Sequence, residues 1–151
     1  MSDYLLDANI LVYLANPASP FHPTTTQAVL KLTANGHTLR TCPQCFVEFR
    51  VVATRPAGAP NGLGLTSLAV AQDTTKFLSV FPILDDTAAI FPFWRNLVEG
   101  HGIIGKPNHD ARLLATAAVH GCSAILTFNA RDFTRYITAV PSVVIVDPTG
   151  V

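Results

Sequence analysis

The sequence is poor in charged side chains and carries no net charge. Only 13% of its 151 residues are charged, ten Lys and Arg balance ten Asp and Glu, and 49% of the residues are apolar. This composition excludes a disordered or fibrous chain and predicts one domain spanning residues 1–151. It offers no general basic surface for a nucleic acid, although carboxylates neutralised by divalent cations would leave the remaining surface effectively positive.

The sequence has no long apolar run, and we expect no export signal. No stretch approaches 18 uninterrupted apolar residues, and the first residues, MSDYLLDAN, carry an acid where an export signal needs basic side chains. The three cysteines are an odd number, which argues against a disulfide framework. We therefore expect a cytoplasmic protein with no membrane association. The high apolar content predicts self-association.

Short apolar segments alternate with segments of helical periodicity. This alternation predicts an α/β fold, an α/β/α sandwich around a mostly parallel central sheet. Asn108 is predicted to be the N-cap of the helix that begins at residue 109. The Gly- and Pro-rich segment 56–65 predicts a mobile loop. The predicted strands are 4–6, 38–41, 80–84, 124–128 and 143–146, and the predicted helices are one ending at 35–36 and those at 8–14, 44–54, 67–77, 87–99 and 109–120.

Four carboxylates stand beside strongly apolar runs: Asp7, Glu48, Asp110 and Asp132. Asp7 and Asp132 each follow a predicted strand, at the sheet edge where α/β proteins bind ligands, and Glu48 and Asp110 lie on helices that can face the same space. Placing several of only ten carboxylates in apolar surroundings is costly unless a cation compensates them. Oxygen ligands without Cys or His favour Mg²⁺ or Mn²⁺, ions that serve phosphoryl chemistry. Asp110 alone fits a helix-capping role equally well.

Four fragments in this order and spacing are similar to a known family. LLDANILVYL at 5–14, VEF at 47–49, HDARLLATAAVHG at 109–121 and ILTFNARDF at 125–133 resemble the PIN-domain nucleases, and more narrowly the VapC toxins of bacterial toxin-antitoxin pairs. The resemblance covers essentially the whole chain, as a single PIN domain. This chain departs from the family pattern at Ala8, where the family often has Thr, and in segment 56–65, which is rich in glycine for this family.

The resemblance implies a Mg²⁺-dependent endoribonuclease, with Mn²⁺ able to substitute, a homodimer, and a cognate antitoxin protein whose tail occupies the acidic pocket. Asp7 would be the central metal ligand, Glu48 and Asp110 would complete the metal sphere or hold its waters, and Asp132 would act through water. The polar residues that support these acids from behind would be Asn9, Thr127 and Asn129.

Several basic and polar residues leave alternatives open. Arg50, Arg112 and Arg131 lie near the acids in sequence and are candidate RNA phosphate contacts, although an ordinary solvated face is as good an interpretation. His109 could act as a base, but a metal site does not require one. Cys42 and Cys45 have the spacing of a redox motif or of a zinc knuckle, but there is no second pair of cysteines, which favours coincidence.

Two other functions compete with a nuclease. The first is a catalytically inactive PIN-like module that binds RNA or a protein. The second is a phosphatase or phosphotransferase with a nucleophilic aspartate, which typically needs a second acid two residues later, where this chain has Asn9. The sequence leaves open which RNA is cut, whether one or two metal ions act, and which antitoxin binds.

Overall fold

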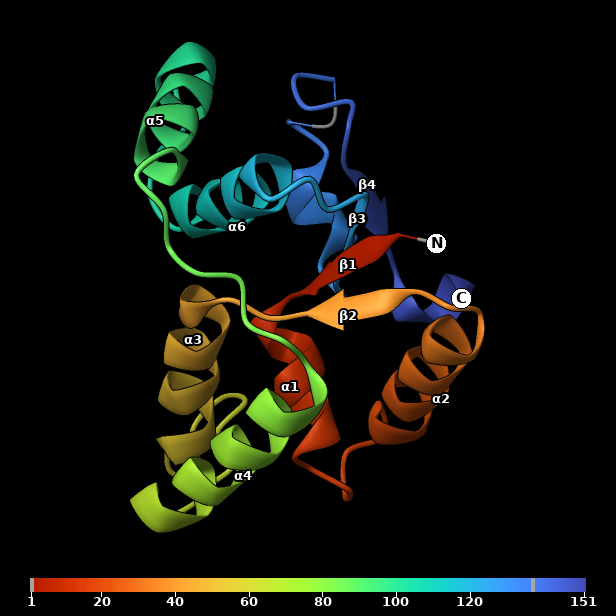
Figure 1. Ribbon diagram of the computed structural model, residues 1–151. Coiled ribbons are helices and arrows are strands. Elements are labelled where there is room, and N and C mark those ends of the chain that lie inside the picture. The colour runs from red at the N-terminus through yellow and green to blue at the C-terminus, as the bar shows by residue number, and fades with distance from the viewer. Residues whose placement is uncertain (1, 137) are drawn as a thin grey trace.

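The computed structural model describes residues 2–136 and 138–151, which form a parallel sheet surrounded by helices (Figure 1). The four strands are ordered β2-β1-β3-β4, and every pairing is parallel, which confirms the predicted fold class. The strands are β1 (Asp3–Leu6), β2 (Thr38–Arg40), β3 (Ala124–Leu126) and β4 (Val144–Val146). The α-helices are α1 (Ala8–Leu14), α2 (His22–Ala34), α3 (Pro43–Thr54), α4 (Ser67–Val80), α5 (Ile90–His101) and α6 (Pro107–Val119), and the short 3-10 helices are η1 (Ala130–Phe133) and η2 (Pro148–Gly150).

The chain order of the strands creates a switch point between β1 and β3. From β1 the chain passes through α1 and α2 to β2 on one side, and it returns through α3 to α6 to β3 on the other side. In Figure 1, α5 and α6 lie on one side of the sheet and α2 on the other, while α1 and α3 begin just beyond the carboxyl ends of β1 and β2. A crevice at such a switch point is where parallel α/β sheets bind ligands.

The central strands are buried on both faces, as a parallel sheet covered by helices requires. Leu5 and Leu6 of β1 and Ile125 and Leu126 of β3 have no exposed surface. Helix α6 is buried along much of its length, which reflects its alanine-rich sequence and its packing against α5 and β3. None of the helices in the described residues is long and apolar enough to cross a membrane.

The predicted strand at 80–84 is wrong. Helix α4 continues to Val80, and only one isolated bridge, between Ile83 and Thr41, joins the following segment to the edge of β2. Thr41 donates its N–H to the carbonyl of Pro82 and accepts the N–H of Leu84. Pro82 has no N–H to donate, so an apolar run with strand propensity makes one bridge and cannot extend into a ladder.

The predicted N-cap at Asn108 is also wrong. Helix α6 begins at Pro107, whose missing N–H costs nothing in a first turn, and it follows Lys106 with no side-chain cap. The Asn108 amide instead donates to the carbonyl of Gly105 at 2.8 Å. The preceding helix, predicted at 87–99, begins later, at Ile90, and ends with Gly102 in the left-handed conformation.

The Gly- and Pro-rich segment 56–65 is a loop, as predicted, but it folds back on the end of α3. Gly64 donates its N–H to the carbonyl of Arg55 at 2.7 Å, and Leu65 donates to that of Ala53 at 2.9 Å. These bonds satisfy carbonyls at the carboxyl end of α3 and restrict the free movement expected from composition. The loop therefore caps α3 at the end opposite to its start at Pro43.

Candidate active site

Asp7 lies at the carboxyl end of β1, at the switch point of the sheet. Its N–H extends the β1–β3 ladder by donating to the carbonyl of Leu126 at 3.0 Å, and its Oδ1 accepts the N–H of Ala8 at 2.6 Å as the N-cap of α1. The residue is only 6% exposed. Burial raises the pKa of Asp7 to about 6, a hydrogen bond from Thr127 opposes that rise, and the charge of Glu48 adds to it.

Three predicted supporting residues surround Asp7. The Thr127 hydroxyl donates to Asp7 Oδ2 at 2.8 Å, and the Asn9 amide donates to Thr127 Oγ1 at 3.2 Å and, in a long contact of 3.5 Å, to Asp7 Oδ2. Asn129 contributes through its backbone, because its N–H donates to Thr127 Oγ1 at 3.0 Å while its side chain is exposed. These bonds fix the rotamer of the Asp7 carboxylate before any ligand arrives.

Asp110 occupies the first turn of α6 and is half-buried. Burial raises the pKa of Asp110 to about 7, and the charges of Asp7, Asp132 and Glu48 raise it further, while Lys106 lowers it. The start of a helix favours a carboxylate, but this effect is outweighed by burial and by the neighbouring acids. Asp110 is thus poised between its charged and neutral forms near neutral pH.

Glu48 lies in the middle of α3 and is partly buried. Its Oε1 accepts a hydrogen bond from the Gln44 side-chain amide at 3.0 Å, one helical turn earlier. The same Gln44 nitrogen donates to the carbonyl of His109 at 2.7 Å, next to Asp110. Sequence reasoning missed Gln44, although its position four residues before Glu48 on a predicted helix was a usable signal.

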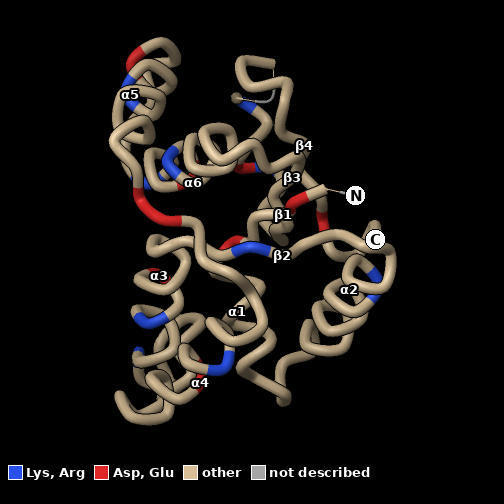
Figure 2. Tube along the Cα trace, in the orientation of Figure 1, with Lys and Arg blue, Asp and Glu red and all other residues tan. Residues whose placement is uncertain are grey.

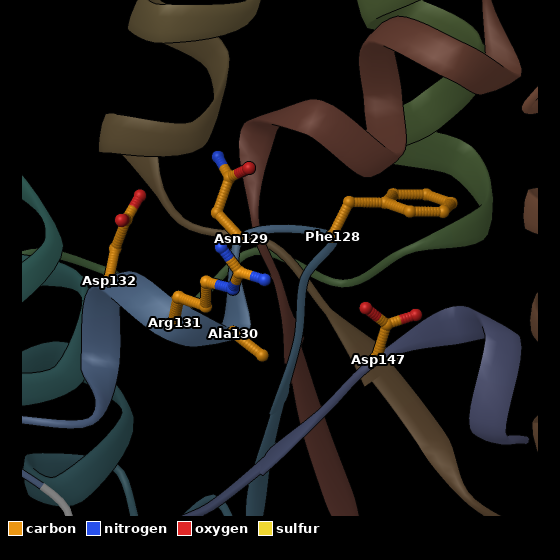
Figure 3. Close-up of a pocket in the computed structure, with 6 residues that line it drawn as sticks. All are labelled: Phe128, Asn129, Ala130, Arg131, Asp132 and Asp147. Atoms are coloured by element: carbon orange, nitrogen blue, oxygen red, sulfur yellow. The ribbon is translucent and has the colours of Figure 1, made fainter.

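Asp132 is the most exposed of the four acids. It lies on η1, where its N–H donates to the carbonyl of Asn129 at 2.9 Å. Figure 3 shows the Asp132 and Asn129 side chains pointing to the same side, with Arg131 beside them and Phe128 turned away. Together with Ala130 and Asp147 these residues line a hollow of about 240 Å³. The other three acids do not line this hollow.

The four acids lie close enough for their charges to affect one another's pKa values. Glu48 and Asp132 raise the pKa of Asp7, and all three raise that of Asp110. Within the described residues, however, no three Asp, Glu, His or Cys side chains lie close enough to enclose a metal ion as they stand. Mg²⁺ commonly binds one or two protein carboxylates and keeps several waters, so the donors present suit this ion without forming a complete cage.

The three candidate arginines differ in their surroundings. Arg50 is exposed on α3 and donates to Ser67 Oγ at 2.5 Å, and Arg131 is exposed beside Asp132. Arg112 is partly buried and donates to Gln44 and to Asp86, each at 3.2 Å. Figure 2 shows Lys and Arg positions on several different helices.

Cys42 and Cys45 are both fully buried at the start of α3, with their Sγ atoms 3.2 Å apart. Cys45 Sγ donates to the carbonyl of Leu6, so the thiol packs behind the end of β1. Cys42 is the N-cap of α3, as its predicted position near the helix start requires. Within the described part of the chain no third Asp, Glu, His or Cys side chain joins these thiols as a possible ligand, and the interpretation of the spacing as coincidental stays a prediction.

The fold and the site together define a parallel α/β protein with a carboxylate cluster at the switch point of its sheet. The chain belongs to the PIN domain family, whose family model matches residues 4–137. The predicted family is thereby confirmed.

Solved structures of similar fold are toxin-antitoxin proteins. VapBC2 from Rickettsia felis, bound to a promoter DNA fragment, is 21% identical over 96% of this chain and 98% of that chain, with a TM-score of 0.67. A toxin-antitoxin complex from Klebsiella pneumoniae is 24% identical over 96% and 97%, with a TM-score of 0.64. Mycobacterium tuberculosis VapC20, a sarcin-ricin loop cleaving toxin, is 18% identical over 81% and 86%, with a TM-score of 0.57. No curated protein matches this chain by sequence.

Proposed function

We propose that this chain is a Mg²⁺-dependent endoribonuclease of the VapC type, which hydrolyses phosphodiester bonds in RNA and is neutralised by a cognate antitoxin. The observation that carries this proposal is the group of four interacting acids at the switch point of a PIN fold. Burial, together with the charges of the neighbouring acids, raises the pKa values of Asp7 and Asp110, and a bound divalent cation would favour their ionised forms. Similarity to VapC20, a toxin that cleaves the sarcin-ricin loop, supports RNA as the substrate class.

Within this proposal the acids have distinct roles. Asp7 would be the principal ligand of Mg²⁺ or Mn²⁺, because Thr127 and the Ala8 N–H already fix its carboxylate. Glu48 and Asp110 would hold the ion or its waters, and the exposed Asp132 would act through water. When bound, the cation supplies a Lewis acid that favours ionisation of the attacking water and neutralises charge on the phosphate.

The RNA would be held by basic side chains at the rim of the acidic site. We assign phosphate contacts to Arg131 beside Asp132, to the exposed Arg50, and to Arg112 near the start of α6. Because bases in a duplex are hidden from side chains, single-stranded or loop RNA is the expected target.

A cognate antitoxin and a second copy of the chain are the proposed protein partners. The Rickettsia felis and Klebsiella pneumoniae structures are of toxins with their antitoxins, which supports an antitoxin for this chain. Large apolar side chains remain exposed, among them Val47, Leu68 and Phe91 on helices and Ile104 in the connection between α5 and α6. Covering such side chains is a common reason for a homodimer.

Substitution of Asp7 tests the proposed reaction. We expect Asp7→Asn to lower Mg²⁺-dependent RNA cleavage by about 100-fold or more and to abolish growth inhibition, because it removes the charge of the principal ligand. The matched control is Asp73→Asn on α4, which should cleave RNA at the parent rate. Cleavage of a labelled RNA and circular dichroism are measured in parallel. A folded Asp7→Asn protein that cleaves RNA at the parent rate would falsify the mechanism.

A catalytically inactive PIN-like module that binds RNA or a protein is the second candidate function. The observation in its favour is that no three acids in the described residues enclose an ion as they stand. The same assay separates the two functions. An inactive module would bind labelled RNA equally well with Mg²⁺ or with EDTA and would leave it uncut.

A further inference from the structure

The side-chain amide of Gln44 connects the two helices that carry Glu48 and Asp110. Its Nε2 donates to Glu48 Oε1 at 3.0 Å, within α3, and to the carbonyl of His109 at 2.7 Å, in the first turn of α6. One nitrogen thus uses both of its protons on acceptors at the acidic site. The residues joined by the second bond are 65 positions apart in the sequence.

The orientation of this amide is fixed by its partners. Gln44 Oε1 accepts a hydrogen bond from Arg112 Nη1 at 3.2 Å, and a guanidinium is only a donor, whereas the His109 carbonyl is only an acceptor. A flipped amide would therefore lose both bonds. Arg112 is itself held by Asp86, whose Oδ1 accepts from Nη2 at 3.2 Å.

These four side chains, Asp86, Arg112, Gln44 and Glu48, form one chain of hydrogen bonds, which we call the Gln44 relay. It begins in the connection between α4 and α5, crosses α6 and ends on α3. A glutamate side chain is flexible, so an oriented donor on one carboxylate oxygen restricts its rotamers and leaves the other oxygen for a ligand. The bond to His109 fixes the start of α6 relative to α3, and with it the backbone beside Asp110.

We propose that Gln44 is a positioning residue of the acidic site: it orients Glu48 directly, and it sets the spacing between Glu48 and Asp110 through the start of α6. Arg112 contributes by fixing the amide. This inference rests on the proposed metal-dependent function, which it deepens by assigning the hydrogen bonds that hold the ligands in place.

Metal affinity of the full chain tests the proposal without RNA. Gln44→Met keeps the length of the side chain and removes its donors and its acceptor, and Gln72→Met on the exposed face of α4 is the matched control. By isothermal titration with Mn²⁺ we expect Gln44→Met to bind about 10-fold more weakly than the parent, as is usual when a residue behind a ligand is removed. Gln72→Met should bind like the parent. The melting temperature of both variants in EDTA should stay within a few degrees of the parent.

Different outcomes separate this inference from the proposed function. If the parent binds Mn²⁺, Asp7→Asn does not, and Gln44→Met binds with the parent's affinity, then the positioning role is wrong and the proposed function stands. If Gln44→Met does not fold, Arg112→Ala replaces it, and the same 10-fold loss is expected because the amide loses its fixed orientation.

If the folded parent does not bind Mn²⁺, the proposed function fails, and the relay is judged by nuclear magnetic resonance in EDTA. Gln44→Met identifies the two side-chain amide protons of Gln44. We expect slow exchange of these protons with water and shifts of both signals in Arg112→Ala and in Glu48→Gln. Fast exchange, or signals that neither substitution moves, would overturn the relay itself.

Discussion

Asp7 combines three tasks in one residue. Its backbone extends the ladder of β1 with β3, its Oδ1 caps α1, and its Oδ2 accepts the Thr127 hydroxyl. The hydrogen bonds favour the charged carboxylate, yet the pKa of Asp7 is raised to about 6 because burial outweighs them. The metal-free protein therefore contains carboxylates whose ionisation opposes folding, a common compromise at functional sites.

Asp110 supplies the clearest test of how far the ionisation of a buried carboxylate opposes folding. Its pKa rises from 3.8, the ordinary value of an Asp side chain, to about 7 in the folded chain. Between these two pH values the folded protein therefore holds a proton that the unfolded chain has released. The contribution of Asp110 to the free energy of unfolding then falls as pH rises from about 4 to 7. Because Asp110 is only half-buried, solvent screening reduces the effect to the order of 1 kcal/mol.

We expect metal-free Asp110→Asn to melt about 3 °C above the parent at pH 8, with a smaller difference at pH 5, since the amide never ionises. Thermal unfolding in EDTA at both pH values measures this, with Asp73→Asn as control. A parent that becomes more stable from pH 5 to pH 8 relative to Asp110→Asn would contradict the assigned shift.

At the scale of the elements, local signals predicted most boundaries. Helix α1 was predicted at 8–14 and is found there, because Asp7 starts it and Asn16 and Pro17 stop it. The strand predicted at 80–84 is wrong, because helix α4 continues to Val80 and the proline at position 82 prevents a ladder at the sheet edge, so strand propensity does not decide the structure. An apolar run of this length is compatible with either a strand or a helix.

The candidate site was predicted from its acids and from the family resemblance, and its hydrogen bonds were not predictable. Residues alone placed Asp7 at the end of a strand and Asp110 in a first turn, as found. The contact between Gln44 and His109 joins residues 65 positions apart, and no local pattern encodes such a distance. Which carboxylates approach one another depends on how α3 and α6 pack, which is a tertiary property.

The loop after α3 gives a prediction about stability alone. A Cβ at Gly62 would lie 2.1 Å from the carbonyl oxygen of Pro56, whereas at Gly58 nothing lies within 4 Å. We expect Gly62→Ala to destabilise the protein by about 1–3 kcal/mol, because backbone must move, and Gly58→Ala to be nearly neutral. Urea unfolding compares the two variants. Equal midpoints would show that the loop does not hold this conformation in solution.

On the scale of the whole molecule, strand order brings the site together. The order β2-β1-β3-β4 places the ends of β1 and β3 side by side, so Asp7 and Thr127 meet although they are 120 positions apart. Helices α3 and α6 then add Glu48 and Asp110 from the long crossover between β2 and β3. The sheet is thus a frame on which distant segments present acids to one space.

Metal binding should stabilise the whole fold. At a Mn²⁺ or Mg²⁺ concentration of about 100 times the dissociation constant, we expect about 3 kcal/mol of added stability, or a rise of about 5–10 °C in melting temperature. The rise should shrink below pH 6, because protons compete for Asp7, whose pKa lies near that value. Differential scanning fluorimetry with and without EDTA measures it. An equal rise in Asp7→Asn would place the ion elsewhere.

The bond between Asn9 and Thr127 spans 118 positions, and this separation has a consequence for biosynthesis. A ribosome that has made β1, α1 and β2 has made a chain with Asp7 but without the strand that completes its surroundings. The acidic site cannot assemble until β3 and η1 have left the ribosome. Synthesis itself therefore delays the appearance of the site until long after Asp7 has been made.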